Sequence, residues 1–167
     1  MDRVNAVLRH PRFSESLRRT AELEADRLFC RHGIDHLLAV SRIACILNLE
    51  AVCKVDNELL YAAGLLHDIG RWRQYEDDTP HEKESARIAA EILPDCGFSP
   101  AEINKILEAI LSHRVKEDTN QSQVSTEADA RILAEIIFRA DKLSRCCFEC
   151  VAYEQCRRIE KNTRLEY

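Results

Sequence analysis

Apolar residues recur along this chain at the spacing of an α-helix, and no segment alternates apolar and polar residues as a β-strand does. The first clear stripe contains Leu37, Val40, Ile43, Ala44 and Leu47. A second stripe contains Ile132, Leu133, Ile136, Ile137, Ala140 and Leu143. Because such helices bury their apolar faces against one another, the pattern predicts an all-α protein with about five core helices and short flanking helices.

Proline, glycine and capping residues set the expected ends of these helices. We expect helices before Pro11 and over about 14–29, 35–49, 56–67, 80–93, 100–113 and 126–143, with Gly33 ending the second, Pro94 and Gly97 stopping the fifth, and Asp56 and Thr126 as N-caps. Two segments, Thr79–Glu82 and Ser99–Glu102, each have the hydroxyl, proline and glutamate of a capping box. The polar segments 70–78 and 116–125 are predicted to be loops.

Composition narrows the class of protein. The 167 residues are 46% hydrophobic and 32% charged, which favours one compact domain over a disordered chain. We expect residues 1–33 to form N-terminal helices before a core at about 35–143, and 144–167 to form a cysteine-rich tail. The net charge of −5 is the wrong sign for coating nucleic acid. With no export signal and no apolar run long enough to cross a membrane, we expect a cytoplasmic protein.

Several histidines and one aspartate interrupt helix faces that are otherwise apolar. His36 stands at the head of the first stripe, His67 ends the helix that contains Ala63, and His113 follows Ile110. Asp141 lies one turn after Ile137. Each histidine alone is compatible with an ordinary hydrogen-bonded core position. Together with Asp68, however, the set predicts converging imidazole and carboxylate ligands for iron, manganese or zinc.

These residues lie in an ordered series of motifs. The series is His36 with Val40, AAGLLHDIGR at 62–71, His81 with Ser85-Ala86, ILSHR at 110–114 and ADKL at 140–143. It resembles the HD-domain superfamily of metal-dependent phosphohydrolases over about residues 35–143. No Gly-Tyr-Pro follows the His-Asp-Ile-Gly segment, so the chain departs from the cyclic-dinucleotide phosphodiesterases of that superfamily.

The resemblance implies that His36, His67, Asp68 and Asp141 hold a divalent transition metal such as Fe or Mn. His81 and His113 correspond to the extra ligands of members with two metals, in which Asp68 would bridge the ions. His81 also stands at a helix start beside Glu82, where a surface role is the alternative.

The activity expected from such a site is phosphoester hydrolysis by attack of metal-bound hydroxide on a nucleotide or related small phosphorylated molecule. Asp68, Lys142, Arg71 and Arg114 are the candidate catalytic residues, although each of the three cations is also compatible with a solvated surface position. The alternatives are an HD-fold di-iron oxygenase and a non-catalytic nucleotide-sensing module.

Two features stay open at this point. Trp72 and Tyr75 in the predicted loop are compatible with base stacking or with local packing. The last four of the eight cysteines, Cys146, Cys147, Cys150 and Cys156, are compatible with a metal site or with reduced cysteines packed at a helix end.

Overall fold

The computed structural model describes residues 1–52, 55–113, 128–158 and 161–167. Over these ranges the secondary structure is helical, and no strand is found among them. The elements are α1 (Asp2–Arg9), α2 (Pro11–Leu23), α3 (Ile34–Glu50), α4 (Asn57–Leu66), α5 (Arg71–Asp77), α6 (His81–Asp95), α7 (Pro100–Ser112), α8 (Ala128–Leu143) and the short 3₁₀ helix η1 (Cys147–Glu149). The predicted all-α fold class is confirmed.

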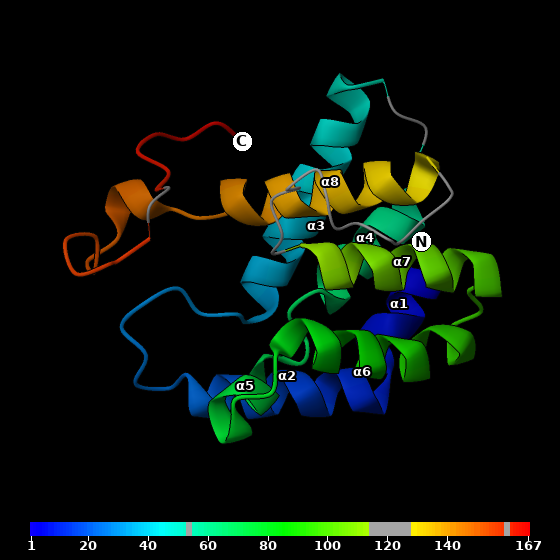
Figure 1. Ribbon diagram of the computed structural model, residues 1–167, viewed down its shortest axis with the longest axis horizontal. Coiled ribbons are helices and arrows are strands. Elements are labelled where there is room, and N and C mark those ends of the chain that lie inside the picture. The colour runs from blue at the N-terminus through cyan, green and yellow to red at the C-terminus, as the bar shows by residue number, and fades with distance from the viewer. Residues whose placement is uncertain (53–54, 114–127, 159–160) are drawn as a thin grey trace, which may run out of the picture.

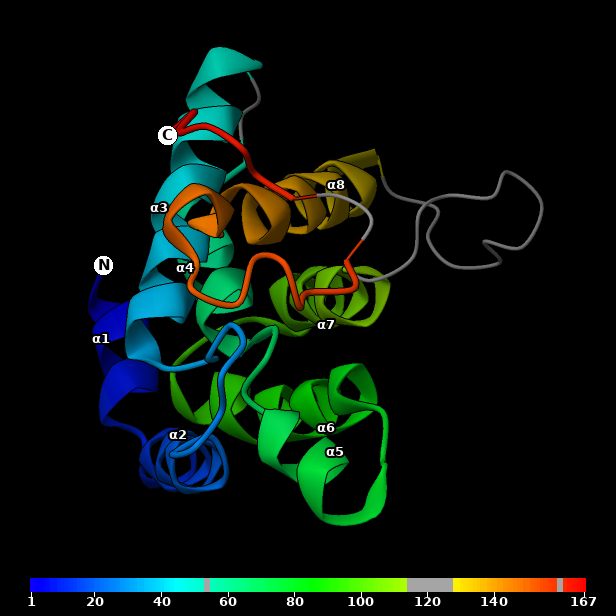
Figure 2. The same ribbon diagram turned by 90° about the vertical axis from the view of Figure 1, so that its left-hand side faces the viewer.

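Five helices form the centre of the bundle, and the other three flank it. α3 packs against both α4 and α8, while α7 packs against α8 and α6. In Figures 1 and 2, α3, α4 and α8 lie on one side of the molecule and α2, α5 and α6 on the other, with α7 between them. The predicted stripes face the interior: Leu37, Val40 and Leu133 are buried.

One glycine allows α3 and α4 to approach closely. A Cβ placed on Gly64 would lie 2.4 Å from Oγ of Ser41 and 2.9 Å from its Cα. Any larger residue at position 64 would therefore push the two helices apart. The contact lies in the last turn of α4, which ends at Leu66 just before His67 and Asp68.

The prediction of a helix over 14–29 was wrong at both ends. α2 begins at Pro11 and ends at Leu23, and Glu24 then turns inward and is 2% exposed. Its carboxylate accepts a hydrogen bond from the backbone N–H of His32 at 2.6 Å. This contact holds the chain in a turn and a non-helical segment before α3 begins.

The predicted loop at 70–78 was also wrong, because residues 71–77 form α5. Trp72 is 3% exposed, so burial of its ring against the bundle stabilises a short helix that lacks an apolar stripe. The guanidinium of Arg19 lies 3.6 Å from the ring centre. Burial of Trp72 settles its role as packing rather than base stacking.

The two predicted capping boxes differ. Ser99 and Glu102 form the box at the start of α7, as predicted. Thr79 does not cap α6: the helix begins at His81 after Pro80, and the Thr79 hydroxyl donates to Asp77 instead, at 2.6 Å. Asp78, with φ of 61°, ends α5 in the left-handed region and directs the chain away from the expected cap.

Pro94 does not end its helix. It lies inside α6, which continues to Asp95. The predicted loop at 116–125 and the proposed cap Thr126 lie outside the described residues. No helix among the described residues is long and apolar enough to cross a membrane.

Candidate metal centre and active site

Six residues from five parts of the bundle converge on one interior region. His36 lies in the first turn of α3, and His67 and Asp68 follow α4. His81 begins α6, His113 follows α7, and Asp141 lies in the last turn of α8. Five of the six are buried and His36 is largely buried. The sequence therefore predicted which helix faces carry inward-pointing polar groups.

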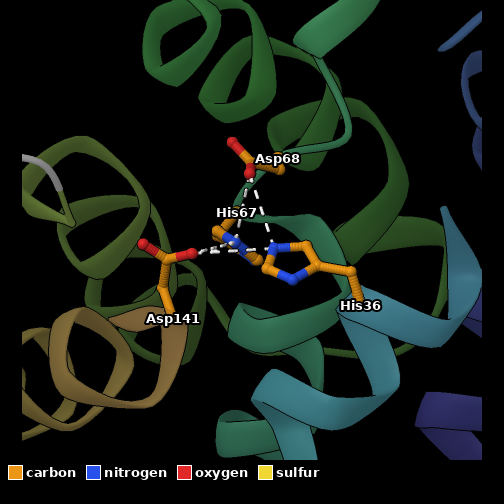
Figure 3. Close-up of side chains that lie close together, drawn as sticks. All are labelled: His36, His67, Asp68 and Asp141. Carbon is orange, nitrogen blue, oxygen red and sulfur yellow. Dashed lines mark ion pairs between the residues drawn. The ribbon is translucent and has the colours of Figure 1, made fainter. Parts of the chain in front are cut away.

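Four of these residues form a first group (Figure 3). Nε2 of His36 lies 3.7 Å from Oδ2 of Asp68 and 3.6 Å from Oδ1 of Asp141. Nε2 of His67 lies 3.4 Å and 4.0 Å from the same two oxygens. One ligand atom from each residue lies within 4.8 Å of the others, which is the spacing that a single ion can span.

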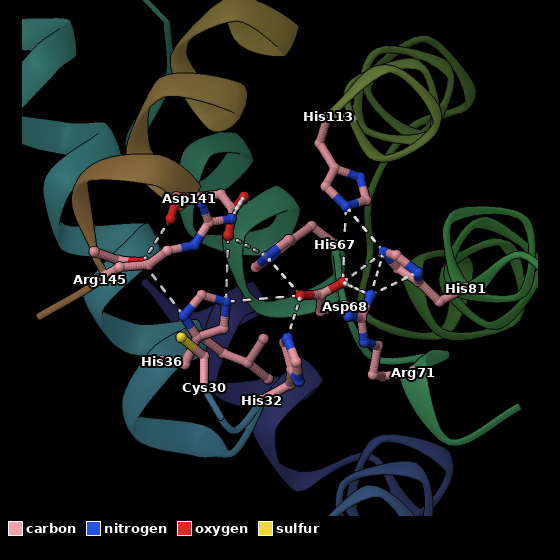
Figure 4. A network of polar contacts seen from close by, with 12 residues as sticks. Cys30, His32, His36, His67, Asp68, Arg71, His81, His113, Asp141 and Arg145 are labelled. Atoms are coloured by element: carbon pink, nitrogen blue, oxygen red, sulfur yellow. Dashed lines mark hydrogen bonds and ion pairs between the residues drawn. The ribbon is translucent and has the colours of Figure 1, made fainter. Parts of the chain in front are cut away.

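A second group shares Asp68 with the first. Oδ1 of Asp68 lies 2.9 Å from Nε2 of His81 and 3.7 Å from Nε2 of His113. Figure 4 shows Asp68 between the two groups, with His36 and His67 on one side and His81 and His113 on the other. Each group thus meets a different oxygen of one carboxylate, which is the arrangement of a bridging ligand.

The hydrogen bonding of the histidine rings shows whether these residues are suited to hold a metal ion. Nε2 of both His36 and His67 is buried and has no hydrogen-bond partner among the residues that the structure describes. The other ring nitrogen of His67 is 2.7 Å from the carbonyl oxygen of Gly64, and that of His113 is 2.6 Å from the carbonyl oxygen of Ile110. A ring that donates from Nδ1 presents the lone pair of Nε2, as histidine ligands of metals do. The donor set fits a divalent transition metal.

The charge balance supports the same conclusion. Burial lowers the pKa of His36 and of His81, which favours the neutral rings that ligate metals. For His67 the lowering effect of burial is outweighed by the carboxylates of Asp68 and Asp141, which raise its pKa. Burial alone would raise the pKa of Asp68, but the charge of His67 and the nearby rings of His113 and His36 hold it well below its usual range. Burial of Asp141 is likewise outweighed by Arg145, His67 and Lys142, which lower the pKa of its carboxyl.

A polar cavity of about 400 Å³ opens onto both groups. Four cationic side chains line it: Arg71, Lys142, Arg145 and Arg158. Nζ of Lys142 and Nη2 of Arg145 lie 2.6 Å and 2.7 Å from Oδ2 of Asp141, and Nη1 of Arg71 lies 2.8 Å from Nδ1 of His81. Arg71 and Lys142 were predicted near the site, whereas Arg114 lies outside the described residues.

Sequence reasoning missed three contributors. Arg145 lies four residues after Asp141, a helical spacing that could have revealed the pair. Arg158 carries no such signal. His32 also lines the cavity, with Nε2 3.8 Å from Oδ2 of Asp68 and Nδ1 2.5 Å from Oε1 of Glu24. It precedes the start of α3, so no helix periodicity indicates its direction.

Glu24 joins His32 to α5. Its Oε1 accepts a hydrogen bond from the hydroxyl of Tyr75 at 2.5 Å. Burial raises the pKa of the Glu24 carboxyl, but the contacts from His32 and Tyr75 outweigh this effect and lower it. The charged carboxylate therefore fixes the ring of His32 at the edge of the cavity. Tyr75 stabilises this carboxylate through its hydrogen bond.

The cysteines of the C-terminal segment do not form a comparable group. Cys147 is buried and Cys146 is exposed, and all four are free thiols. Over the described ranges, neither group of three or more potential metal ligands includes a cysteine. The structure therefore gives no support to a metal site at this cluster.

Comparisons with known proteins agree with this geometry. The family model described as "HD domain" matches residues 33–146. A Clostridium beijerinckii protein named "Uncharacterized protein" is 39% identical over 93% of this chain and 92% of its own length. A Bacillus subtilis protein named "Putative phosphohydrolase YueE" is 29% identical over 71% of this chain and 69% of its own length.

One solved structure also matches. It is the crystal structure of a predicted HD superfamily hydrolase from an uncultured Thermotogales bacterium. It is 26% identical, covers 86% of this chain and 74% of its own, and has a TM-score of 0.56. This likeness extends over most of the bundle that positions the six residues.

Proposed function

The chain belongs to the HD domain family, and from this membership we propose that it is a metal-dependent phosphohydrolase acting on a nucleotide or related small phosphorylated molecule. One observation carries the proposal: two ligand groups share the carboxylate of Asp68 and open into a cavity lined by four cations. The name of the Bacillus subtilis relative supports the same reaction class.

We assign the two ligand groups to two divalent ions. His36, His67, Asp68 and Asp141 would hold one, and Asp68, His81 and His113 would hold the other. When bound, such ions lower the pKa of water and polarise phosphoryl oxygens. The number and identity of the ions belong to this proposal.

The cations of the cavity would bind and orient the phosphoryl group. Guanidinium and ammonium groups donate charge-assisted hydrogen bonds to phosphoryl oxygens and stabilise the charge that develops in the transition state. Lys142 and Arg145 reach the cavity from α8 and the segment after it, and Arg71 reaches it from α5. A phosphoryl group in this cavity would therefore meet cations from two different parts of the bundle.

Buried contacts hold these groups in place before substrate arrives. Arg145 is fixed by Asp141, and Arg71 lies against His81 and donates to Tyr75 at 3.3 Å. A preorganised charge needs little rearrangement during the reaction, and this is the condition under which electrostatic stabilisation is most effective. A cavity lined by four cations suits an anionic phosphoester, and we therefore favour phosphoester cleavage over oxygen chemistry.

The test is phosphate release by the full chain loaded with Mn²⁺ or Fe²⁺, using p-nitrophenyl phosphate and a set of nucleoside phosphates. We expect turnover by the wild type and a loss of about 100-fold or more in Asp68→Asn, because both ligand groups lose a charge. Asp95→Asn, at an exposed carboxylate at the opposite end of α6 from His81, should leave the rate unchanged.

Other outcomes would overturn the proposal. Metal-loaded wild type that consumes oxygen and releases no phosphate would be an oxygenase. Nucleotide binding without turnover would indicate a sensor. Equal rates in the wild type and in Asp68→Asn would show that the ligand cluster is not the reaction centre.

A further inference from the structure

A second cavity, of about 620 Å³, adjoins the catalytic one. Two segments line it: Arg27, Phe29 and Cys30 come from the chain before α3, and Gln155, Cys156, Arg157 and Arg158 come from the C-terminal segment. We call it the tail cavity. Both segments lie on the side of the molecule where α8 ends (Figures 1 and 2).

The two cavities share one residue. Arg158 lines the tail cavity and also the cavity that contains Asp68, Lys142 and Arg145. A molecule with its phosphate beside the metal ligands would therefore meet the tail cavity immediately beyond Arg158. The part of the substrate away from the phosphate would therefore extend into the tail cavity.

The tail cavity lies outside the part of the chain that the family model matches. Its residues fall at 27–30 and 155–158, whereas the match covers 33–146. The ligand groups, by contrast, all fall within the match. The ligand groups thus lie within the matched family domain, whereas the walls of the tail cavity come from the segments before and after it.

The side chains of the tail cavity suit a flat heteroaromatic ring. Phe29 is 40% exposed and offers a ring face for stacking. Arg157 and Arg158 are exposed, and no hydrogen bond or ion pair engages either side chain within the described part of the chain. A guanidinium stacks on a ring or donates to its acceptors, and the amide of Gln155 both donates and accepts.

The opposite wall is held rigidly to the catalytic network. Nε of Arg27 donates to the carbonyl oxygen of Cys30 at 2.9 Å, and the same nitrogen lies 3.8 Å from Oε1 of Glu24. Glu24 also fixes His32 at the edge of the catalytic cavity. The segment that presents Phe29 is therefore anchored next to the reaction centre.

We propose that the tail cavity binds the base of a nucleotide substrate, with Phe29 as the stacking residue and Arg158 between the base and the phosphate sites. The proposal rests on the phosphohydrolase function and specifies which half of the substrate this chain selects. It predicts that nucleoside phosphates are preferred over sugar phosphates that lack a ring system of this kind.

The experiment compares a nucleoside 5′-monophosphate with ribose 5-phosphate in the metal-loaded full chain. Phe29→Ala should raise KM for the nucleotide by about tenfold, because the lost stacking is of that size. The value of kcat, and both constants for ribose 5-phosphate, should change by less than about twofold because the phosphate site is untouched. Phe29→Trp should retain the wild-type KM.

A matched control separates stacking from general effects of removing an exposed ring. Phe148 has nearly the same exposure, 38%, and does not line the tail cavity. Phe148→Ala should leave both substrates unaffected. Circular dichroism of Phe29→Ala should match the wild type, since an exposed residue between α2 and α3 is replaced.

The outcomes distinguish the two proposals. If Phe29→Ala leaves the nucleotide KM unchanged, or alters both substrates equally, the base site is refuted while hydrolysis stands. If no phosphoester is hydrolysed, calorimetric titration with the corresponding nucleoside decides the base site alone. Binding that is weakened by Phe29→Ala supports it, and the absence of binding to the wild type refutes it.

Discussion

At the scale of single residues, Asp68 is the point on which both ligand groups depend. Its two oxygens face different sets of histidines, so any substitution affects both groups together. His81 and His113, in contrast, contact only one oxygen of Asp68. These two histidines are therefore the positions at which one proposed ion can be removed without the other.

We predict that His81→Ala lowers the metal content of the protein from about two ions per chain to about one, because the second group keeps too few ligands to hold an ion tightly. Inductively coupled plasma mass spectrometry after gel filtration measures this directly. His10→Ala, at a histidine paired with Asp95 outside the site, should keep the wild-type content. A wild type that never exceeds one ion would contradict the second group.

Each of the six ligand candidates could be recognised in the sequence by its position. Four lie on apolar helix faces, His81 lies at a helix start, and Asp68 follows His67. His113 and Asp141 follow Ile110 and Ile137 at helical spacing, so their direction could be worked out before the fold was known. His32 could not be found in this way. Its direction depends on Glu24, a contact across a turn that no periodicity encodes.

At the scale of elements, two segments with the same capping pattern adopt different structures. Ser99 accepts from the N–H of Glu102 and completes the box, while Thr79 bonds Asp77 and leaves α6 without a side-chain cap. The difference arises from α5, whose left-handed end at Asp78 precedes Thr79. Local sequence describes the cap, but the preceding helix decides whether it forms.

These two sites provide a paired prediction on stability. Ser99→Ala should lower the free energy of unfolding by about 1 kcal/mol, because an N–H at the start of α7 loses its acceptor. Thr79→Ala should change it by less than about 0.5 kcal/mol, because only an exposed contact is lost. Urea unfolding of the metal-free variants measures both. Equal costs would show that Thr79 caps α6 in solution.

The short helix α5 shows why part of the fold escaped prediction. Its seven residues contain one strongly apolar side chain, Trp72, and begin after Gly70 without a side-chain cap. Burial of Trp72, the ion pair between Arg19 and Glu76, and the hydrogen bond from Tyr75 to Glu24 hold it in place. These contacts join distant segments, so the local pattern indicated a loop.

At the scale of the whole molecule, the ligand candidates come from five different parts of the bundle. α3 and α8 pack side by side, as do α6 and α7, and each contributes to the same centre. Any ion at this centre would link helices that are far apart in the sequence. Binding of a metal at this centre would therefore stabilise the fold.

We predict that saturating Mn²⁺ raises the melting temperature of the metal-free protein by about 5 to 10 °C, because binding at about 100 times Kd adds about 2.7 kcal/mol. Differential scanning fluorimetry with and without a chelator measures the shift. Asp141→Asn should reduce it, since one ligand from α8 is weakened. A melting temperature that does not respond to metal would contradict the proposed centre.

The convergence of the five helices could be predicted from the sequence. Buried polar groups on separate apolar helix faces need polar partners or an ion, so we expect them to lie together. The cations that line the cavity could be predicted only in part. Lys142 adjoins a ligand in the sequence, whereas Arg158 reaches the cavity from the C-terminal segment, where no repeating pattern fixes its position. The tail cavity was invisible for the same reason.

Gly64 has a consequence for how this protein can change over time. Its missing side chain lets two helices touch, and its carbonyl oxygen holds the ring of His67. The packing of α3 against α4 and the orientation of the His67 ring thus depend on the same residue. A larger side chain at position 64 would disturb both, so we expect substitutions to be tolerated better at 27–30 and 155–158, the segments that line the tail cavity, than at this helix contact.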